Sequence, residues 1–119
     1  MNKTFNITFD IIFIVLIVLL CLYFLLRLLN IAQIYEVETG SMEDGIYAGD
    51  YILIVKKDDY KVGDVVTFKK EDYFVTHRII EEDGKEVVTK GDANNTDDGK
   101  VSKSDIVGKV ILKGGILNF

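Results

Sequence analysis

The chain has 119 residues, a length that allows one small domain and at most one appendage. It carries 14 Lys or Arg against 19 Asp or Glu, and the formal net charge of -5 at pH 7 excludes a basic surface for nucleic acid. The single cysteine, Cys21, excludes an internal disulfide, so the fold must be stabilised by burial of apolar side chains.

The first predicted element is a transmembrane helix from Phe9 to Leu29. Ile11 to Leu26 contains no charge and no strong helix breaker, and the whole apolar run reaches the ~20 residues that a helix needs to cross a bilayer. A cleaved secretory signal is the alternative, but its apolar core is usually only ~7 to 15 residues long. Asn30-Ile31-Ala32 also fits a small-x-small cleavage site poorly. We therefore expect a short tail and an uncleaved anchor in residues 1–32, followed by a separate domain in residues 33–119.

The residues that flank this helix give a weak signal for its orientation. Lys3 is the only basic side chain before the helix, whereas Arg27 lies at its far end and two glutamates follow. Charge bias alone does not decide between the two orientations. Because the N-terminal tail is very short, we expect the tail inside and residues 33–119 on the outer face of the plasma membrane.

The segment after the anchor is predicted to be mainly β, as a small barrel or sandwich. Runs rich in Val, Ile, Tyr, Phe and Thr are separated by turn residues about every 8 to 12 positions. No stretch after residue 33 shows helical periodicity, and Asp83-Gly84 gives the strongest hairpin signal. The expected strands are Ile34–Thr39, Asp50–Val55, Asp64–Phe68, Tyr73–Ile80, Lys85–Lys90 and Ile106–Leu112.

The first candidate catalytic residue is Ser41, which lies in Thr39-Gly40-Ser41-Met42-Glu43 and precedes Gly49-Asp50. A serine beside a glycine, where a strand breaks into a turn, can present a free hydroxyl and outward-pointing backbone N–H groups. Many ordinary turns have the same composition. The assignment therefore depends on which other reactive side chains the chain provides.

The only histidine and one acidic loop provide a candidate base and a candidate acid. His77 lies in a run where Val75, His77 and Ile79 would share one face of a strand, a place where a solitary histidine is usually structural. The loop Lys90–Gly99 is rich in Asp and Asn, but it lacks the ligand spacing of a calcium loop, so we expect no metal.

Together, these three features have the parts of a serine acyl-transfer enzyme. A serine hydroxyl is a poor nucleophile and needs a base within hydrogen-bond reach. A neutral imidazole can act as that base when a carboxylate holds its other nitrogen. Such chemistry needs no cofactor, and the residues permit it without requiring it.

Four sequence boxes, in order, resemble those of type I signal peptidases of the endoplasmic-reticulum and archaeal branch, which also occurs in some Gram-positive bacteria. The boxes are Thr39–Glu43 with Gly49-Asp50, Gly63–Phe68, Thr76–Arg78, and Lys90–Asp98. The resemblance covers most of the segment after the anchor. It implies a small signal-peptidase/LexA-like β domain on a single N-terminal transmembrane helix.

The resemblance also implies a role for each triad residue. Ser41 would be the nucleophile, His77 the general base and Asp98 the third member, with Asp97 as the alternative for the third position. Lysine replaces the histidine in the eubacterial branch of the family, so His77 implies the Ser/His/Asp variant. If both adjacent aspartates approached one imidazole, their repulsion would raise one pKa, so only one is expected to point inward.

Supporting residues and two departures from the family pattern complete the expected site. Asp92 would support it through hydrogen bonds, and the Ser41 N–H with the Thr39 hydroxyl would form an oxyanion hole. Asp44 stands where the family usually has proline, so we expect this turn to be less rigid than in other family members. The tail Gly114–Phe119 is too short to span a membrane, so we expect a single-pass protein.

The implied activity is endoproteolytic removal of signal peptides from secretory preproteins at the outer membrane face. The expected partners are these preproteins and membrane lipid, with the secretion translocon as a further candidate and no nucleic acid. The substrate would add as an extended strand near Ser41 and the run from Tyr73 to Ile80, with shallow apolar pockets for its small side chains.

Two alternatives remain open at this point. A LexA-like Ser/Lys peptidase would use Lys85 or Lys90 as its base, and substitution of His77 would then be tolerated. A non-catalytic, membrane-anchored binding domain would need no base at all. Both alternatives keep the predicted fold and differ only in the chemistry of the site.

Overall fold

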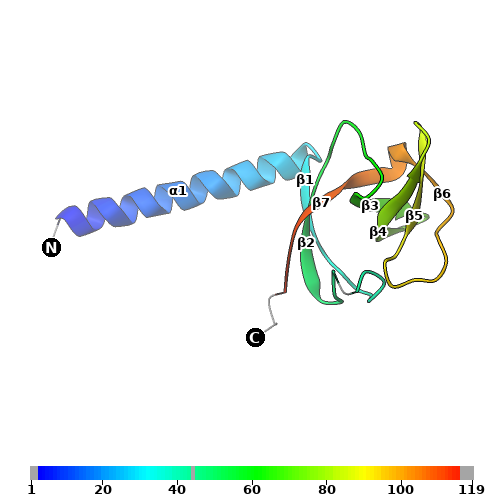
Figure 1. Ribbon diagram of the computed structural model, residues 1–119. Helices are drawn as coiled ribbons and strands as arrows, with labels where there is room; N and C mark the ends of the chain where they lie inside the picture. The colour runs from blue at the N-terminus through cyan, green and yellow to red at the C-terminus, as the bar shows by residue number, and fades with distance from the viewer. Residues whose placement is uncertain (1–2, 44, 116–119) are drawn as a thin grey trace.

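The structure is a computed structural model that describes residues 3–43 and 45–115. It consists of one long helix and a β domain attached to its C-terminal end (Figure 1). This arrangement confirms the predicted mainly β fold on one N-terminal apolar helix. The elements are α1 (Lys3–Leu28), β1 (Ala32–Glu36), β2 (Asp50–Val55), β3 (Val65–Lys70), β4 (Tyr73–Glu82), β5 (Glu86–Lys90), β6 (Lys100–Ser102), the 3₁₀ turn η1 (Lys103–Asp105) and β7 (Ile106–Gly115).

Helix α1 contains a 23-residue stretch, Asn6–Leu28, that is long and apolar enough to cross a membrane. At the usual rise per residue this stretch measures about 35 Å, against a bilayer hydrocarbon core of about 30 Å. Large apolar side chains are exposed around the helix, as expected for an element that is covered by lipid rather than by protein. The apolar helix is thus compatible with a membrane anchor.

The helix ends in a capping motif that joins it directly to the β domain. Asn30 has a positive φ of 56°, and its N–H donates to Arg27 O at 3.0 Å, while the Ile31 N–H donates to Leu26 O at 2.9 Å. These two bonds form a Schellman motif, in which asparagine often takes the left-handed position. The Lys56 N–H then bonds to Ile31 O at 2.8 Å, which ties the junction to the end of β2.

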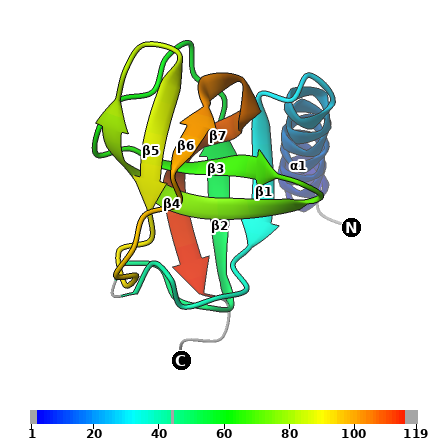
Figure 2. The same ribbon diagram turned by 90° about the vertical axis from the view of Figure 1, so that its right-hand side faces the viewer.

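The strands form one seven-stranded antiparallel sheet in the order β1-β2-β7-β3-β4-β5-β6. Strand β7 pairs with β2 over one part of its length and with β3 over another, with register shifts in both pairings. Such irregularities bend a strand, and β3 and β4 cross the direction of β2 and β7 steeply in Figure 2. A Cβ on Gly108 would lie 3.0 Å from backbone atoms of Val55, so glycine allows the two strands to approach closely at this crossing.

Two apolar clusters fill the space that the bent sheet encloses. Each combines buried side chains from the strands with others from the connections between them. One contains Tyr60, Val66, Phe68, Ile79, Val87 and Ile106. The other contains Met42, Ile46, Ile52 and Ile54, so it includes the residue directly after Ser41.

Several observed strand boundaries differ from the predicted ones. Strand β1 spans Ala32–Glu36 rather than Ile34–Thr39, so Thr39 lies in the connection that leads to Ser41. Strand β6 was not predicted, because three residues carry too little alternation to be recognised. Strand β7 continues to Gly115, since Gly114 and Gly115 pair with β2. The Asp83-Gly84 hairpin is as predicted, with Gly84 at φ 77°.

Candidate active site

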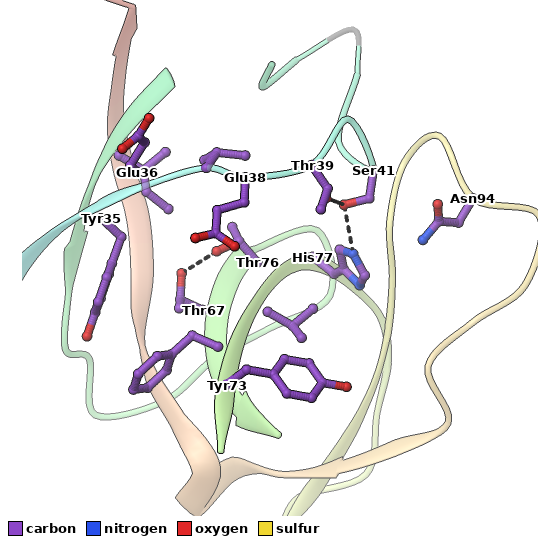
Figure 3. A pocket seen from close by; sticks show the side chains of 14 residues that line it. Tyr35, Glu36, Glu38, Thr39, Ser41, Thr67, Tyr73, Thr76, His77 and Asn94 are labelled. Atoms are coloured by element: carbon purple, nitrogen blue, oxygen red, sulfur yellow. Dashed lines mark hydrogen bonds between the residues drawn. The ribbon is translucent and has the colours of Figure 1, made fainter. Parts of the chain in front are cut away.

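Ser41 lies on a short turn that is anchored to the core by its neighbours. The Gly45 and Ile46 N–H groups both donate to Met42 O, at 3.0 and 2.9 Å. Met42 and Ile46 are 2% and 6% exposed, so their burial fixes the turn against β2. The adjacent Ser41 is left at the surface of the domain, beside the cavity shown in Figure 3. Asp44, which replaces the family's proline, is outside the described residues.

His77 projects from β4 toward the interior of the domain and meets Ser41 at the edge of the core. It is paired with Val66 of β3, its ring centroid is 6.4 Å from that of Phe68, and the residue is only 7% exposed. The Nε2 atom lies 3.0 Å from Ser41 Oγ (Figure 3). This distance allows direct transfer of the serine proton to the imidazole.

Asp98 reaches the other side of the imidazole from the loop that follows β5. Its Oδ2 lies 2.5 Å from His77 Nδ1. The hydroxyl of Thr89 donates to the same Oδ2 at 2.7 Å, and the Asp98 N–H donates to Thr89 O at 2.8 Å. Two bonds to one buried threonine therefore fix both the backbone and the carboxylate of Asp98. Sequence reasoning missed Thr89. The available signal was that Thr89 would share the inward face of its strand with the apolar Val87.

The contacts of His77 are compatible with the proton arrangement that a serine nucleophile needs. If the Ser41 hydroxyl donates to Nε2, the neutral ring carries its proton on Nδ1 and donates it to Asp98. The Thr39 hydroxyl donates to Ser41 Oγ at 3.1 Å. The Ser41 N–H makes no hydrogen bond to any described residue, so it can donate to a bound group. The arrangement is therefore suited to nucleophilic attack by Ser41.

Asp97 and Lys90, the alternative candidates, lie elsewhere in the structure. Asp97 Oδ1 accepts a hydrogen bond from the Gly99 N–H at 2.8 Å, in the turn that follows the site. Lys90 Nζ donates to Gly91 O at 3.2 Å. Within the described residues, neither side chain has a hydrogen bond to Ser41 or His77, and Lys85 lies at the β4–β5 hairpin.

The start of the acidic loop is pressed against the nucleophile turn. The Ala93 N–H donates to Ser41 O at 2.9 Å. A Cβ on Gly91 would lie 2.7 Å from the same oxygen and 2.6 Å from Asn94 Nδ2, so the approach requires glycine at this position. The contact holds the loop that carries Asp98 in place relative to Ser41.

Asp92 does not contact the triad but binds the residue next to His77. Arg78 Nε and Nη2 donate to the two Asp92 oxygens at 3.0 and 2.9 Å, and Arg78 Nη1 donates to Gly63 O at 2.8 Å. The hydrogen bonds from Arg78 lower the pKa of Asp92 below its usual 3.8, its burial opposes this, and the positive charge of Arg78 adds to it. The same pair raises the pKa of Arg78. Asp92 therefore connects β4 to the acidic loop.

This ion pair should make stability depend on pH. A lowered pKa in the folded state means that ionised Asp92 stabilises the fold above the unfolded-state pKa, and that this is lost as the pH falls through the folded-state value. We expect Asp92→Asn to be less stable than the parent chain at neutral pH, and the difference to shrink below about pH 4. Urea unfolding at several pH values measures this. Asp58→Asn, at an exposed aspartate outside the described ion pairs, is the control.

A cavity of about 650 Å³ lies beside Ser41 and His77, between the chain that follows β1 and the start of β4 (Figure 3). Apolar side chains form part of its lining, namely Val37, Ile52 and Val75. Polar side chains, however, also line it: Glu38, Thr67 and Thr76. The cavity is therefore large enough for substrate side chains, and it offers them both apolar and polar contacts.

A serine, a buried histidine and an aspartate in a hydrogen-bonded series are the arrangement that defines serine hydrolases with a catalytic triad. Among the described residues, no group of three or more His, Cys, Asp or Glu side chains could hold a metal ion. Residues 9–111 match the family described as signal peptidase, peptidase S26, and the chain belongs to this family. This membership confirms the resemblance that the four boxes indicated.

Two fungal proteins are among the curated relatives. The chain is 33% identical over 97 residues to the signal peptidase complex catalytic subunit SEC11 of Metarhizium robertsii. It is 30% identical over 97 residues to the SEC11 of Metarhizium acridum. Each alignment covers 67% of this chain and 56% of the relative, so the chain spans about half the length of these relatives.

Proposed function

We propose that this chain is a membrane-anchored serine endopeptidase that removes signal peptides from secretory preproteins on the extracytoplasmic side of the plasma membrane. The observation that carries the proposal is the hydrogen-bonded series from Ser41 Oγ through His77 to Asp98, at 3.0 and 2.5 Å. Membership of the signal peptidase family supports the substrate class. The apolar helix α1 supports the location at a membrane.

In the proposed mechanism, Ser41 Oγ attacks the scissile carbonyl while His77 Nε2 takes its proton. The carboxylate of Asp98 holds the ring and stabilises the imidazolium that forms. The oxyanion accepts a hydrogen bond from the Ser41 N–H, and the Thr39 hydroxyl turns from Ser41 Oγ to become the second donor, each worth about 3 kcal/mol. His77 then protonates the leaving amine. In the second half, it deprotonates the water that releases Ser41 from the acyl-enzyme.

The membrane anchor contributes by restricting where the enzyme meets its substrate. Helix α1 joins β1 through the capped turn at Asn30, so the domain is connected to the bilayer by only a few residues. Signal peptides also end close to the membrane surface. Confinement of both partners to one surface raises their effective concentration without any new contact. Lipid and secretory preproteins are therefore the proposed partners, with the translocon as a further one.

The test of this proposal uses the full chain in liposomes with a precursor that carries a signal peptide. We expect cleavage at a single bond, identified by N-terminal sequencing of the product. His77→Ala should lower kcat/KM by about 10³-fold or more, because loss of a general base usually costs 10² to 10⁴. Lys90→Ala is the matched control for the alternative Ser/Lys mechanism, and it should cleave at nearly the parent rate. Retained activity in His77→Ala with loss in Lys90→Ala would favour lysine as the base.

A further inference from the structure

One wall of the cavity beside the triad carries an acidic side chain that the proposed mechanism does not use. Glu38 extends from the chain after β1 across the cavity toward Thr76 (Figure 3). Glu36, two residues earlier, points away from Thr76 in the same view. Both glutamates line the cavity, and the Glu38 carboxylate is the one that points toward Thr76.

The Glu38 carboxylate has no partner within the part of the chain that the structure describes. It takes part in none of the ion pairs or side-chain hydrogen bonds among the described residues. The nearby hydroxyls of Thr67 and Thr76 are bonded to each other at 2.7 Å. The residues that line the cavity include no lysine and no arginine. The Glu38 carboxylate is therefore available to a cationic group that enters the cavity.

Glu38 is close enough to the nucleophile to contact residues near the scissile bond. It precedes Ser41 by three residues, and three extended residues span at most about 10 Å. A peptide bound as an extended strand covers the same distance with its own three residues. A side chain within three positions of the cut can thus reach the Glu38 carboxylate, and a long lysine or arginine can place its charge there while its stem packs on Val37 and Val75.

We infer that Glu38 determines specificity, so that this enzyme prefers substrates with lysine or arginine within three residues of the scissile bond. The inference rests on the proposed function and adds to it the class of side chain that is selected. It places one charged contact beside the shallow apolar pockets that the sequence predicts for small side chains. The carboxylate acts in binding only, since it has no hydrogen bond to Ser41, His77 or Asp98.

The experiment compares kcat/KM for a set of otherwise identical peptides in which each position within three residues of the cut carries Lys, Gln or Glu. We expect one position at which Lys is preferred over Gln by roughly fivefold and Glu is disfavoured, as an exposed ion pair allows. Glu38→Gln should reduce this ratio to about one, and Glu38→Lys should reverse it in favour of Glu. The preference should also weaken at high salt.

Glu36→Gln is the matched control, because it removes the same charge two residues earlier, on a side chain that points away from Thr76 (Figure 3). We expect it to keep the Lys-to-Gln ratio. An equal fall in the ratio for both variants would overturn the assignment to Glu38. A parent ratio near one at every position, with cleavage that still depends on Ser41, would overturn the inference but leave the proposed function intact. Failure of the parent chain to cleave any peptide in a Ser41-dependent way would instead refute the proposed function.

Discussion

Ser41→Ala should abolish cleavage of a precursor that carries a signal peptide, with a fall in kcat of about 10⁵ to 10⁶-fold. Loss of the nucleophile of a triad lowers kcat by a factor of this order, because the remaining groups cannot replace the covalent step. In this chain the substitution removes the one hydroxyl that lies 3.0 Å from His77 Nε2. The measurement is single-turnover cleavage of a labelled precursor in liposomes.

The fold should survive this substitution, so lost activity can be separated from lost structure. The turn that carries Ser41 is fixed by Met42 and Ile46, which are buried, and by the backbone bond from Ala93 to Ser41 O. Removing a hydroxyl at its edge should change the free energy of unfolding by only about 1 kcal/mol. Circular dichroism and membrane insertion of Ser41→Ala should therefore match the parent chain. Cleavage by this variant at the parent rate would show that another residue is the nucleophile.

The fold could be predicted from the sequence where local patterns are strong. The apolar run of α1 needs no tertiary information, and the Asp83-Gly84 hairpin lies between two alternating runs. The bend of β7 could not be predicted in this way. It follows from the pairing of β7 with both β2 and β3 and from the close approach of Gly108 to Val55. That contact joins residues far apart in the chain, so no local pattern contains it.

The residues of the candidate site could be predicted from their types, but their arrangement in space could not. Ser41 and His77 were candidates because they are the reactive residues in a turn and on a strand, and the family resemblance supplied their roles. The choice between Asp97 and Asp98 depends on which side chain the loop turns inward, and in the structure Asp98 bonds to His77 while Asp97 bonds to Gly99. Adjacent residues in a loop differ in direction, and composition does not encode that.

The place of Glu38 in the cavity lining was not predicted from the sequence. A strand as far as Thr39 was predicted, with regular alternation through Glu38. The strand ends instead at Glu36, although the Val37 N–H still donates to Asp50 O at 2.8 Å and the Gly49 N–H donates to Val37 O at 2.7 Å. Directly after this last pairing, Glu38 extends across the cavity toward Thr76 (Figure 3).

Asp98→Asn should lower kcat by about 10⁴-fold while KM changes little, which is the effect of the same substitution in other Ser/His/Asp triads. The physical reason lies in proton positions. The carboxylate can only accept, so it keeps the imidazole proton on Nδ1 and leaves Nε2 free to receive the proton of Ser41. An asparagine that turns its NH₂ toward Nδ1 forces the ring proton to Nε2, where it blocks transfer from Ser41. If it turns its oxygen instead, the charge that stabilises the imidazolium is still lost.

Asp97→Asn provides a matched control for this prediction, since it makes the same chemical change one residue away. Asp97 bonds to the Gly99 N–H in the turn, and asparagine can make that bond too, so we expect activity within about twofold of the parent. Cleavage rates of the two variants on one precursor, with kcat and KM measured separately, decide the assignment. A large loss in Asp97→Asn with normal rates in Asp98→Asn would mean that the loop rearranges when substrate binds and that Asp97 orients the base. Because Thr89 holds Asp98 by two hydrogen bonds, such a rearrangement would have to break both of them, and we therefore expect Asp98 to be the sensitive position.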